Sequence, residues 1–526
     1  MREELTSLEQ NLLRRNVAGD ILKRSARRHP DRRALRFLRR NYTFRELNEA
    51  VNRCAHGLMQ RGIRKGDRAA ILSHNCDSFI IVWWGLLKIG AVLTPLNWML
   101  KETEIRYILD HCEPRALFVE DGLIGGIGNL RYELPSVRTF AYMRLTDTGV
   151  PGDWMNIEEL WRPENPVSEP EVIIENGDVA TLLYTSGTEA MPKGVMNSHL
   201  NFTSSMASAQ TDILLRQDDV MIGGIPLFHV AGLWMFTACC ALGGLTVLEY
   251  LPDLREILEL TQEERVTRWC WPTTVYSNLP KVSGFENYDL SSLRVCQMFG
   301  SPAPPALLDQ WRRIVPGISF MNCYGQTEMT PLGATISGRE FDLRPDSVGR
   351  AMLPVELRIV GADEREVPRG EVGEIVVRGP NVMPGYFRDE EKTQATQRGG
   401  WHHTGDLGRM DESGYLYFVD RIKDMIKTGG ENVASADVEA SLLSHPKVFD
   451  AAVIGMPDEV WGEAVTALVV PAQGQTLEEK ELLAWCKSRM AAFKVPKKVF
   501  VVAELPRNPS GKILKRELRQ KYAAPV

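Results

Sequence analysis

The segment with the clearest chemistry runs from Tyr184 to Gly194 and reads YTSGTEAMPKG. It follows an apolar run typical of a buried strand, and it brings hydroxyls, glycine and a lysine close together. In such a loop, backbone N–H groups and hydroxyls can face a polyphosphate, glycine allows close approach, and lysine supplies a cation. The ending Gly-Lys-Ser/Thr of a Walker A loop is missing. By itself, the composition fits a surface loop as well as a phosphate-binding loop.

Four further segments carry reactive or flexible residues. They read NCYGQTE at Asn322–Glu328, WHHTGD at Trp401–Asp406, DRIKDMIKTGGEN at Asp420–Asn432 and PRNPSGKI at Pro506–Ile513. Together with the hydroxyl-rich loop, and in this order, they closely resemble the adenylate-forming superfamily of acyl-CoA synthetases, luciferases and peptide-synthetase adenylation domains. The resemblance extends from about Thr43 to the C-terminus.

The resemblance implies a reaction in two halves. A carboxylate attacks the α-phosphate of ATP, pyrophosphate leaves, and an acyl-adenylate forms; the thiol of CoA then displaces AMP to give a thioester. Both halves build or move negative charge, so the protein must chiefly position its substrates and neutralise charge. We therefore expect an AMP-forming acyl-CoA synthetase that uses ATP, Mg²⁺, CoA and a small carboxylic acid.

The matching positions imply a nucleotide site. The loop 185–188 with Lys193 is expected to hold the β- and γ-phosphates. Tyr324 is expected to stack on adenine, and Glu328 to bind the Mg²⁺ that bridges the phosphates. The full set that the resemblance implies for ATP is Thr185, Ser186, Gly187, Thr188, Lys193, Gly300, Ser301, Pro302, Asn322, Tyr324, Gly325, Thr327, Asp406, Arg421, Lys427 and Lys512.

Toward the C-terminus, Asp406 matches the acid that takes the ribose hydroxyls, with Arg421 beside it. Lys512 matches the catalytic lysine, which touches both the carboxylate and the α-phosphate in the transition state. Lys512 stands in a Gly-rich turn, from which a long side chain can reach another domain.

The resemblance places an interdomain hinge at Lys423. It implies that the C-terminal domain closes with Lys512 inward for adenylation, then rotates to present Gly429 and Gly430 beside the pantetheine tunnel of CoA. Such a lid would keep water from the reactive mixed anhydride. Lys427 is expected at the phosphate of the adenylate.

His229, in PLFHVAGL, matches an aromatic or His gate near the carboxylate of the acid. The expected catalytic residues are thus Lys512, His229 and Glu328. No Lys or Arg that could pair with a second carboxylate stands among the residues that follow His229. This favours a medium- or long-chain fatty acid or an aromatic monocarboxylic acid over a dicarboxylic acid. A lone His before an apolar helix is also often a packed residue. The expected acyl pocket comprises His229, Val230, Ala231, Trp234 and Met235.

Two positions of the phosphate loop depart from the family pattern. Glu189 and Ala190 stand where Thr or Ser and then Gly are common. An acidic side chain near pyrophosphate would repel it unless that side chain points to solvent, so the effect of these two residues is left open.

Two other functions fit the same motifs. One is an adenylation enzyme that passes the acyl group to a carrier-protein thiol, and the other is an inactive acyl- or nucleotide-binding homologue. The segment PDEVWGE at Pro457–Glu463, together with TGGEN, looks more like stand-alone CoA ligases. The presence of Lys512, Glu328 and Asp406 argues against a loss of activity.

These loops need strands and helices to position them. TFRE at Thr43–Glu46 has the spacing of a capping box and predicts a helix through roughly Arg61. Apolar runs predict strands over 67–73, 90–94, 179–184, 220–225, 245–250 and 293–299, and a helix over 79–88. This alternation predicts a largely parallel sheet covered by helices.

The pattern of predicted strands and helices changes at two points along the sequence. Short strand-like runs after about residue 342 indicate a small β-rich unit. The last segment has a helix near 436–443, strands over 448–455 and 464–470, and a helix capped by Thr476 and Glu479. We therefore predict an α/β protein with a large N-terminal domain, residues 1–420, of parallel-type sheets with helices plus a small β-rich unit. A smaller α+β lid domain would cover residues 421–526.

Composition narrows the class of protein. The chain has 526 residues, 44% hydrophobic and 25% charged, with a formal net charge of −6, which is typical of a globular protein and excludes a global basic field for nucleic acid. Nine scattered cysteines indicate buried thiols of a reducing compartment, and the charged N-terminus is no secretory signal, so we expect a cytoplasmic protein. The uncharged run 230–248 is interpreted as a buried helix and strand rather than a membrane span. Peripheral membrane contact and a homodimer are left open.

Overall fold

The computed structural model describes residues 5–127, 130–185, 192–299, 303–507 and 513–522. The chain divides into two compact units, one of residues 1–356 and 377–402 and the other of residues 357–376 and 403–526. Segments 357–376 and 403–420 thus group with the C-terminal part of the chain. The domain boundary after residue 420 and the hinge at Lys423 stay predictions.

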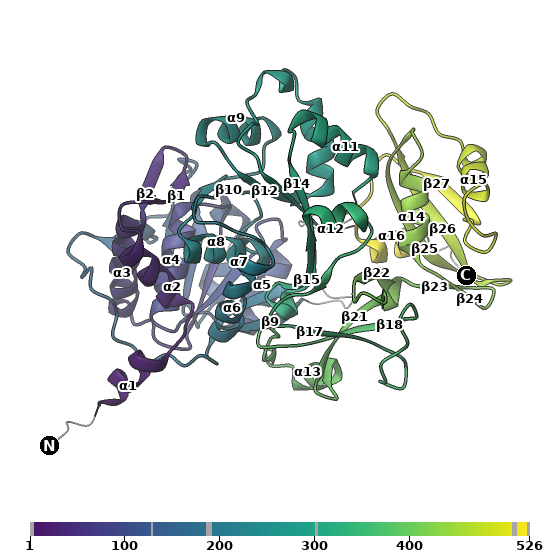
Figure 1. Ribbon diagram of the computed structural model, residues 1–526. Coiled ribbons are helices and arrows are strands. Elements are labelled where there is room, and N and C mark those ends of the chain that lie inside the picture. The colour runs from purple at the N-terminus through teal and green to yellow at the C-terminus, as the bar shows by residue number, and fades with distance from the viewer. Residues whose placement is uncertain (1–4, 128–129, 186–191, 300–302, 508–512, 523–526) are drawn as a thin grey trace. The chain divides into compact units, whose positions relative to one another are not determined.

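The first unit contains two large sheets (Figure 1). One has eight strands in the order β19-β9-β8-β4-β3-β5-β6-β7, and those from β8 to β7 run parallel. Strands β9 and β19 add to β8 in antiparallel fashion. The strands are β3 (Arg68–Leu72), β4 (Val92–Leu96), β5 (Ala116–Glu120), β6 (Thr139–Met143), β7 (Met155–Asn156), β8 (Val179–Thr185), β9 (Lys193–Ser198) and β19 (Gly385–Tyr386).

The other sheet has nine strands in the order β16-β15-β14-β13-β12-β10-β11-β1-β2. Strands β14 to β1 are parallel, and the outer strands are antiparallel, so the prediction of largely parallel sheets is confirmed. The strands are β1 (Arg33–Phe37), β2 (Arg40–Thr43), β10 (Val220–Gly223), β11 (Leu245–Leu248), β12 (Arg268–Pro272), β13 (Val295–Phe299), β14 (Ser319–Gly325), β15 (Leu332–Ser337) and β16 (Arg350–Ala351).

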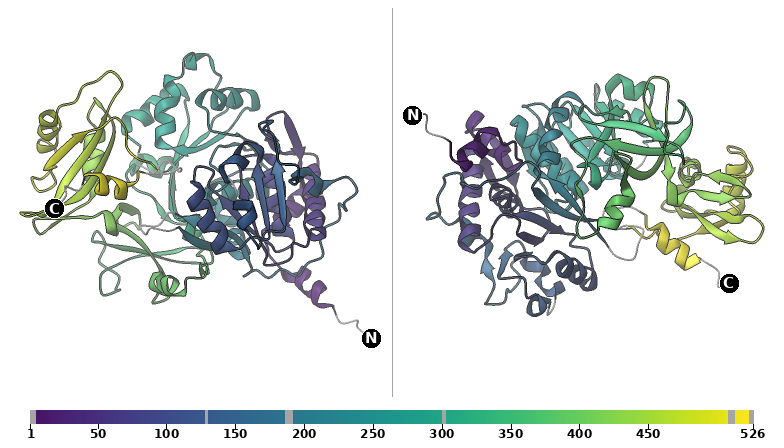
Figure 2. Two further views of the ribbon diagram at one scale, coloured as in Figure 1. Left: turned by 180° about the vertical axis from the view of Figure 1, so that it is seen from behind. Right: turned by 90° about the horizontal axis from the view of Figure 1, so that it is seen from below.

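Helices of the first unit pack on and between these sheets, which Figure 2 shows from behind and from below. Helix α3 (Phe44–Gln60) begins at the predicted capping box, in which Thr43 and Glu46 bond each other's backbone N–H. Every residue of α4 (Asp77–Lys88) is buried, as expected for a helix that is apolar on all sides. The rings of Trp83 and Trp84 lie 6.2 and 6.1 Å from Phe236 of α8 (Val230–Leu242).

The uncharged run is a buried helix, α8, followed by the buried strand β11, as predicted. Across the described ranges, we find no helix with the length and apolar character needed to cross a bilayer. The remaining helices of the first unit are α1 (Ser7–Arg14), α2 (Gly19–Arg28), α5 (Glu102–Cys112), α6 (His199–Ser204), α7 (Met206–Thr211), α9 (Leu254–Glu264), α10 (Thr273–Asn278), α11 (Pro305–Ile314), α12 (Gly338–Leu343) and α13 (Glu390–Thr396).

The predicted β-rich segment forms a five-stranded sheet in the order β17-β18-β21-β20, with β22 paired to β21. Its hairpins are antiparallel, which short connections between neighbouring strands require. The strands are β17 (Glu356–Val360), β18 (Val372–Arg378), β20 (Gln397–Arg398), β21 (Trp401–Met410) and β22 (Leu416–Arg421).

The second unit ends in another five-stranded sheet, β24-β23-β26-β25 with β27 beside β26. Helices α14 (Ser435–Leu443) and α15 (Glu479–Lys487) pack on one apolar face, and α16 (Lys515–Tyr522) packs on the other. Alternate residues of β25 point to opposite faces of the sheet, so this strand contributes apolar side chains to the clusters on both faces. The strands are β23 (Ile426–Thr428), β24 (Glu431–Val433), β25 (Val448–Asp458), β26 (Gly462–Pro471) and β27 (Lys498–Val501).

The predicted cap of α15 is wrong. The helix begins at Glu479 after the N-cap residue Glu478, whose side chain makes no capping bond. Gln475 instead closes a turn by donating its N–H to the carbonyl of Ala472, so the chain enters the helix later than a cap at Thr476 would require.

Candidate functional site

Strands β8 and β9 hold the two ends of the hydroxyl-rich loop. They pair antiparallel, with Tyr184 opposite Gly194 and Thr185 opposite Lys193. Because β8 runs parallel to β4, the loop leaves the carboxyl end of a parallel strand, where α/β proteins bind ligands. The expected phosphate contacts that fall outside the described residues are Ser186, Gly187 and Thr188, together with the unusual Glu189 and Ala190.

Lys193, Tyr386 and Glu328 form a cluster at this end of the sheet. The Lys193 Nζ atom lies 5.3 Å from the centre of the Tyr386 ring. The Tyr386 hydroxyl donates a 3.0 Å hydrogen bond to Oε1 of Glu328. Burial and the nearby Glu328 charge raise the pKa of Tyr386, so its hydroxyl remains a donor. A cation, a donor and a carboxylate thus stand together at the base of the loop.

Backbone contacts fix the short 3-10 helix η6 (Thr327–Met329), which carries Glu328. Nδ2 of Asn197 donates to the carbonyl of Thr327 at 3.0 Å and to Oγ1 of Thr330 at 2.8 Å. The N–H of Met383 donates to the carbonyl of Glu328 at 2.8 Å. Residues from β9 and from the segment before β19 therefore position the carboxylate.

Strand β14 leads into this helix and carries three of the predicted nucleotide contacts. Tyr324 is buried, and Nδ2 of Asn322 donates to the carbonyl of Ser347 at 3.2 Å. A Cβ atom at Gly325 would lie 1.8 Å from the carbonyl oxygen of Pro331, so only glycine fits this turn. Strand β13 ends next to β14, and the residues that follow it, Gly300, Ser301 and Pro302, lie outside the described part of the chain.

His229 is the N-cap residue of α8 and is half-buried. Its Nε2 atom has no hydrogen-bond partner, and the Phe228 ring lies 4.3 Å away. Burial lowers the pKa of His229 to about 4, so the imidazole is neutral near pH 7. A neutral imidazole offers one hydrogen-bond donor and one acceptor.

The other predicted acyl-pocket residues occupy the first turns of α8. Val230, Trp234 and Met235 are buried, and Ala231 is half-buried. The Trp234 indole N–H donates to Oγ of Ser205 at 2.7 Å, which locks that ring against the segment between α6 and α7.

In the second unit, Asp406 of β21 and Arg421 of β22 are direct cross-strand partners. Nε of Arg421 lies 3.5 Å from Oδ1 of Asp406, which is buried. The adjacent Asp420 points elsewhere and accepts from the N–H and the hydroxyl of Ser435 at 2.6 and 2.7 Å. Strand register therefore brings together the two residues predicted at the ribose.

The predicted hinge and CoA residues follow in the same unit. Lys423 lies in the 3-10 helix η7 (Ile422–Asp424), and both Lys423 and Lys427 of β23 are exposed. Gly429 and Gly430 turn the chain from β23 to β24 with φ of +59° and +83°, the left-handed region that favours glycine.

Lys512 lies outside the described residues. On either side of it, Arg507 and Ile513 form an isolated antiparallel bridge, so the two ends of the Gly-rich turn meet. The neighbouring basic residues are already paired, because Lys515 contacts Glu439 at 2.7 Å and Arg519 contacts Asp424 at 2.9 Å.

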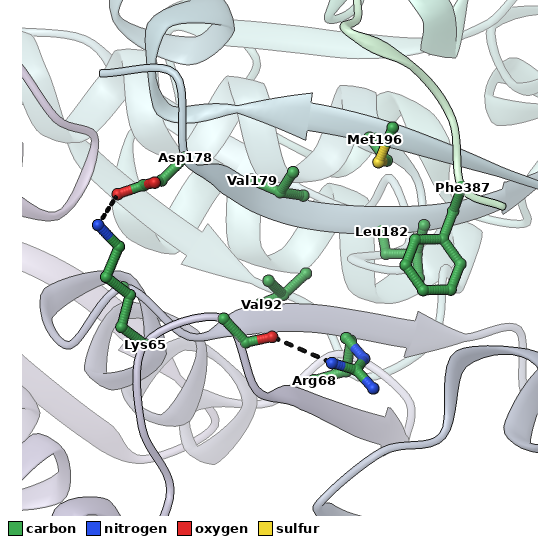
Figure 3. Close-up of a pocket in the computed structure, with 10 residues that line it drawn as sticks. Lys65, Arg68, Val92, Asp178, Val179, Leu182, Met196 and Phe387 are labelled. Carbon is green, nitrogen blue, oxygen red and sulfur yellow. Dashed lines mark hydrogen bonds and ion pairs between the residues drawn. The ribbon is translucent and has the colours of Figure 1, made fainter. Parts of the chain in front are cut away.

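A separate cavity of about 190 Å³ lies in the first unit (Figure 3). Val92, Val179 and Leu182 line it, and at its rim Lys65 pairs with Asp178 at 2.7 Å. Val92 and Val179 begin β4 and β8, so the cavity lies near the amino ends of strands whose carboxyl ends carry the loop. The cavity is therefore distinct from the candidate site.

Sequence reasoning missed Tyr386 and Asn197. Tyr386 lies 58 residues from its partner Glu328 and Asn197 lies 130 from Thr327, so no local spacing links them. The pair Gly385–Tyr386, a glycine beside an aromatic residue, is the one local feature that could have marked Tyr386 as a candidate site residue. Sequence reasoning also missed the buried Glu249. Its position near the end of a predicted strand could have marked it as a candidate site residue.

The family model described as "AMP-binding enzyme" matches residues 22–387, and the model "AMP-binding enzyme C-terminal domain" matches residues 437–512. The chain belongs to the AMP-binding enzyme family. The predicted adenylate-forming class and the predicted α/β fold, with its large N-terminal and small C-terminal parts, are confirmed.

Relatives of this AMP-binding enzyme match it along nearly its whole length. A feruloyl-CoA synthase from Amycolatopsis sp is 36% identical over 514 residues, covering 97% of this chain and all of that protein. An indoleacetate–CoA ligase from Aromatoleum aromaticum is 33% identical and covers 96% of this chain and 98% of its own. The crystal structure of the anthranilate CoA ligase AuaEII in complex with anthranoyl-AMP matches with a TM-score of 0.89 and 28% identity, over 96% of this chain and 97% of that one.

Proposed function

We propose that this AMP-binding enzyme, an acid–CoA ligase, adenylates an aromatic monocarboxylic acid and transfers the acyl group to CoA. The main support for this proposal is the cluster of Lys193, Tyr386 and Glu328 at the end of the hydroxyl-rich loop. The cluster combines a cation for the phosphates with a carboxylate for Mg²⁺. The two relatives above are a feruloyl-CoA synthase and an indoleacetate–CoA ligase, and both names support an aromatic acid.

Glu328 fits a Mg²⁺ ligand. It offers half-buried carboxylate oxygens, one of which is held by Tyr386. Within the described ranges, no three His, Cys, Asp or Glu side chains gather to hold a metal by themselves. Mg²⁺ commonly takes one or two carboxylates and fills its remaining positions with phosphate oxygens and water. When bound, the ion would neutralise charge on the phosphates.

Other residues of the chain are proposed to bind the nucleotide and the acid. Lys193 places a positive charge at the terminal phosphates, and Asp406 with Arg421 receives the ribose. Neutral His229 stands near the acid and leaves the carboxylate as the attacking anion. Lys512 is proposed to bridge the carboxylate and the α-phosphate as negative charge shifts between them.

We further propose that residues 421–526 act as a lid that pivots near Lys423. The turn at Gly429 and Gly430 supports this role, since its backbone needs left-handed conformations that glycine adopts without strain. In the thioester step this turn would face the pantetheine arm of CoA.

Other assignments remain predictions. Delivery to a carrier-protein thiol, a cytoplasmic location, peripheral membrane contact and a homodimer are of this kind. The nine cysteines, all within the described ranges, are free thiols, which supports a reducing compartment. A fatty acid substrate is the second candidate, favoured by the small Ala231 at the start of α8.

ATP–pyrophosphate exchange with a panel of acids tests the proposal. The panel pairs cinnamate, benzoate and indole-3-acetate with decanoate, and malonate serves as a dicarboxylate control. We expect exchange with at least one aromatic acid to exceed that with decanoate about tenfold, and thioester formation with free CoA rather than with a carrier-protein thiol. Failure to exchange with any acid would overturn the enzyme proposal, and faster exchange with decanoate would overturn the aromatic class.

A further inference from the structure

Three neighbouring parallel strands of the nine-stranded sheet, in the order β12-β10-β11, end in a group of buried residues. Glu249 follows the last residue of β11, Gly224 follows the last residue of β10, and Trp271 is next to last in β12. All three therefore lie at the carboxyl edge of the sheet. The same edge carries the ends of β13 and β14, where the adenine contacts are predicted.

Gly224 brings the Glu249 carboxyl and the Trp271 ring together. A Cβ atom at Gly224 would lie 2.7 Å from Oε2 of Glu249 and 1.7 Å from a carbon of the Trp271 six-membered ring. Both groups thus pack against the bare α-carbon of Gly224. Any side chain at this position would push the ring or the carboxyl away.

Glu249 is fully buried, with 0% of its surface exposed, and neither carboxyl oxygen has a hydrogen-bond partner. The indole N–H of Trp271 is also buried and unpartnered. Buried polar groups in native proteins are nearly always hydrogen-bonded, so unsatisfied groups at the edge of a site point to a ligand that completes them.

Unlike Glu249 and Trp271, polar residues nearby in the chain and in the adjoining loop are hydrogen-bonded. The next residue, Tyr250, donates its hydroxyl to Glu120, and Glu120 also accepts from the backbone and ring of His74 at 2.9 Å. The Leu227 N–H donates to Asn75 at 2.8 Å, which pins the loop between Gly224 and His229.

The charge state of Glu249 suits a neutral partner. Burial raises the pKa of its carboxyl well above the usual value, and the negative charges of Glu256 and Asp253 add to this. Burial thus favours the protonated carboxyl, which offers one hydrogen-bond donor and one acceptor. A hydroxyl matches it in both roles.

We propose that Glu249 is a specificity-determining residue that hydrogen-bonds a hydroxyl or ring N–H at the end of the acid remote from its carboxylate. The inference rests on the proposed ligase function and refines its substrate class. The loop that begins at Gly224 ends five residues later at His229. One short segment therefore packs against Glu249 through Gly224 and also carries the residue predicted beside the carboxylate of the acid. An unsubstituted ring or an alkyl chain would leave Glu249 unpaired and would bind less well.

Matched pairs of acids test this role. We would measure kcat/KM for adenylation of 4-hydroxycinnamate against cinnamate, 4-hydroxybenzoate against benzoate, and indole-3-acetate against 1-naphthaleneacetate. In the wild type, we expect the polar acid of at least one pair to be favoured by about tenfold to a hundredfold. In Glu249→Leu, that ratio should fall at least tenfold, chiefly through loss of the polar acid.

Two further variants serve as controls. Glu249→Gln keeps a donor and an acceptor and should retain most of the preference, whereas Glu259→Leu, at an exposed position of α9, should leave it unchanged. Equal losses for both acids of a pair in Glu249→Leu would overturn the proposal and make Glu249 a purely structural residue. If Glu249→Leu fails to fold, a wild-type ratio below about threefold in every pair overturns it.

Failure of the ligase function is distinguishable from failure of this inference. Wild-type protein that exchanges pyrophosphate with no acid would refute the proposed function. Protein that activates acids but ignores the polar substituent would refute only the role of Glu249.

Discussion

The Tyr386 hydroxyl donates a 3.0 Å hydrogen bond to Glu328 across 58 residues of sequence. The same tyrosine ring lies 5.3 Å below the Nζ atom of Lys193, so one side chain contacts the carboxylate and supports the lysine. Short strands make this possible, because β19 pairs with β9 and β9 begins at Lys193. Tyr386 is therefore a positioning residue for the predicted phosphate and magnesium groups.

Tyr386→Phe should weaken the use of Mg·ATP while leaving the fold intact. The variant keeps the ring beneath Lys193 but removes the donor to the Glu328 carboxylate. A hydrogen bond to a charged group contributes about 1.5–3 kcal/mol, so kcat/KM for Mg·ATP should fall about tenfold or more. Pyrophosphate exchange at varied Mg²⁺ measures this, with a rightward shift in the magnesium dependence. Tyr417→Phe removes a similar bond to Asp411 in the second unit and should change neither quantity. An unchanged Mg·ATP dependence in Tyr386→Phe would refute the positioning role.

Lys512→Ala should separate the two halves of the reaction. Adenylation should fall by at least about a hundredfold, because a positioned charge at the transition state is lost. Thioester formation from preformed acyl-adenylate should be nearly unchanged, because the proposed lid turns Lys512 away in that step. Arg516→Ala, an exposed basic residue nearby, is the control and should affect neither half. Adenylation by Lys512→Ala at the wild-type rate would show that the assigned role is wrong.

Gly325→Ala should disable the nucleotide site through the backbone. The added Cβ would stand 1.8 Å from the Pro331 carbonyl oxygen, so the turn that positions Glu328 must shift. We expect kcat/KM for ATP to fall more than tenfold and the melting temperature to drop by several degrees. Gly126→Ala adds the same methyl group where no atom lies within 4 Å and should match the wild type. Equal behaviour of the two variants would contradict this account of Gly325.

The buried His199 and the half-buried His229 should make the first unit sensitive to acid. Burial lowers the pKa of His199 and of His229 to about 4, from an unfolded value of 6.5. Both are thus neutral when folded, and the stability they contribute is complete above pH 6.5 and is lost as the pH falls toward 4. Each histidine can contribute a slope of up to about 1.4 kcal/mol per pH unit in this window.

His199→Gln isolates one of these histidines, since neither ring nitrogen of His199 has a hydrogen-bond partner. Urea midpoints at pH 7.5, 6.5, 5.5 and 4.5 should fall less steeply in the variant than in the wild type. Parallel curves would exclude titration of His199 as a cause of acid sensitivity.

Features set by neighbouring residues could be predicted from the sequence. The capping box at Thr43 and Glu46 begins α3 as expected, because both bonds form within one helical turn. The same holds for the strand that enters the hydroxyl-rich loop and for the uncharged run that forms α8 and β11. The family motifs likewise drew attention to Glu328, Asp406 and Arg421, each within a contiguous segment, and their roles at the nucleotide stay predictions.

Only the tertiary structure decided which distant residues meet. Strand order does not follow chain order, since β12 lies between β13 and β10, and no periodicity in the sequence encodes that order. The sequence by itself therefore determined the reaction class and the residues offered to it. The fold decided that Tyr386 supports Glu328 and that Glu249 is buried without a partner, because hydrogen bonding and burial depend on neighbours that strand pairing brings from remote parts of the chain.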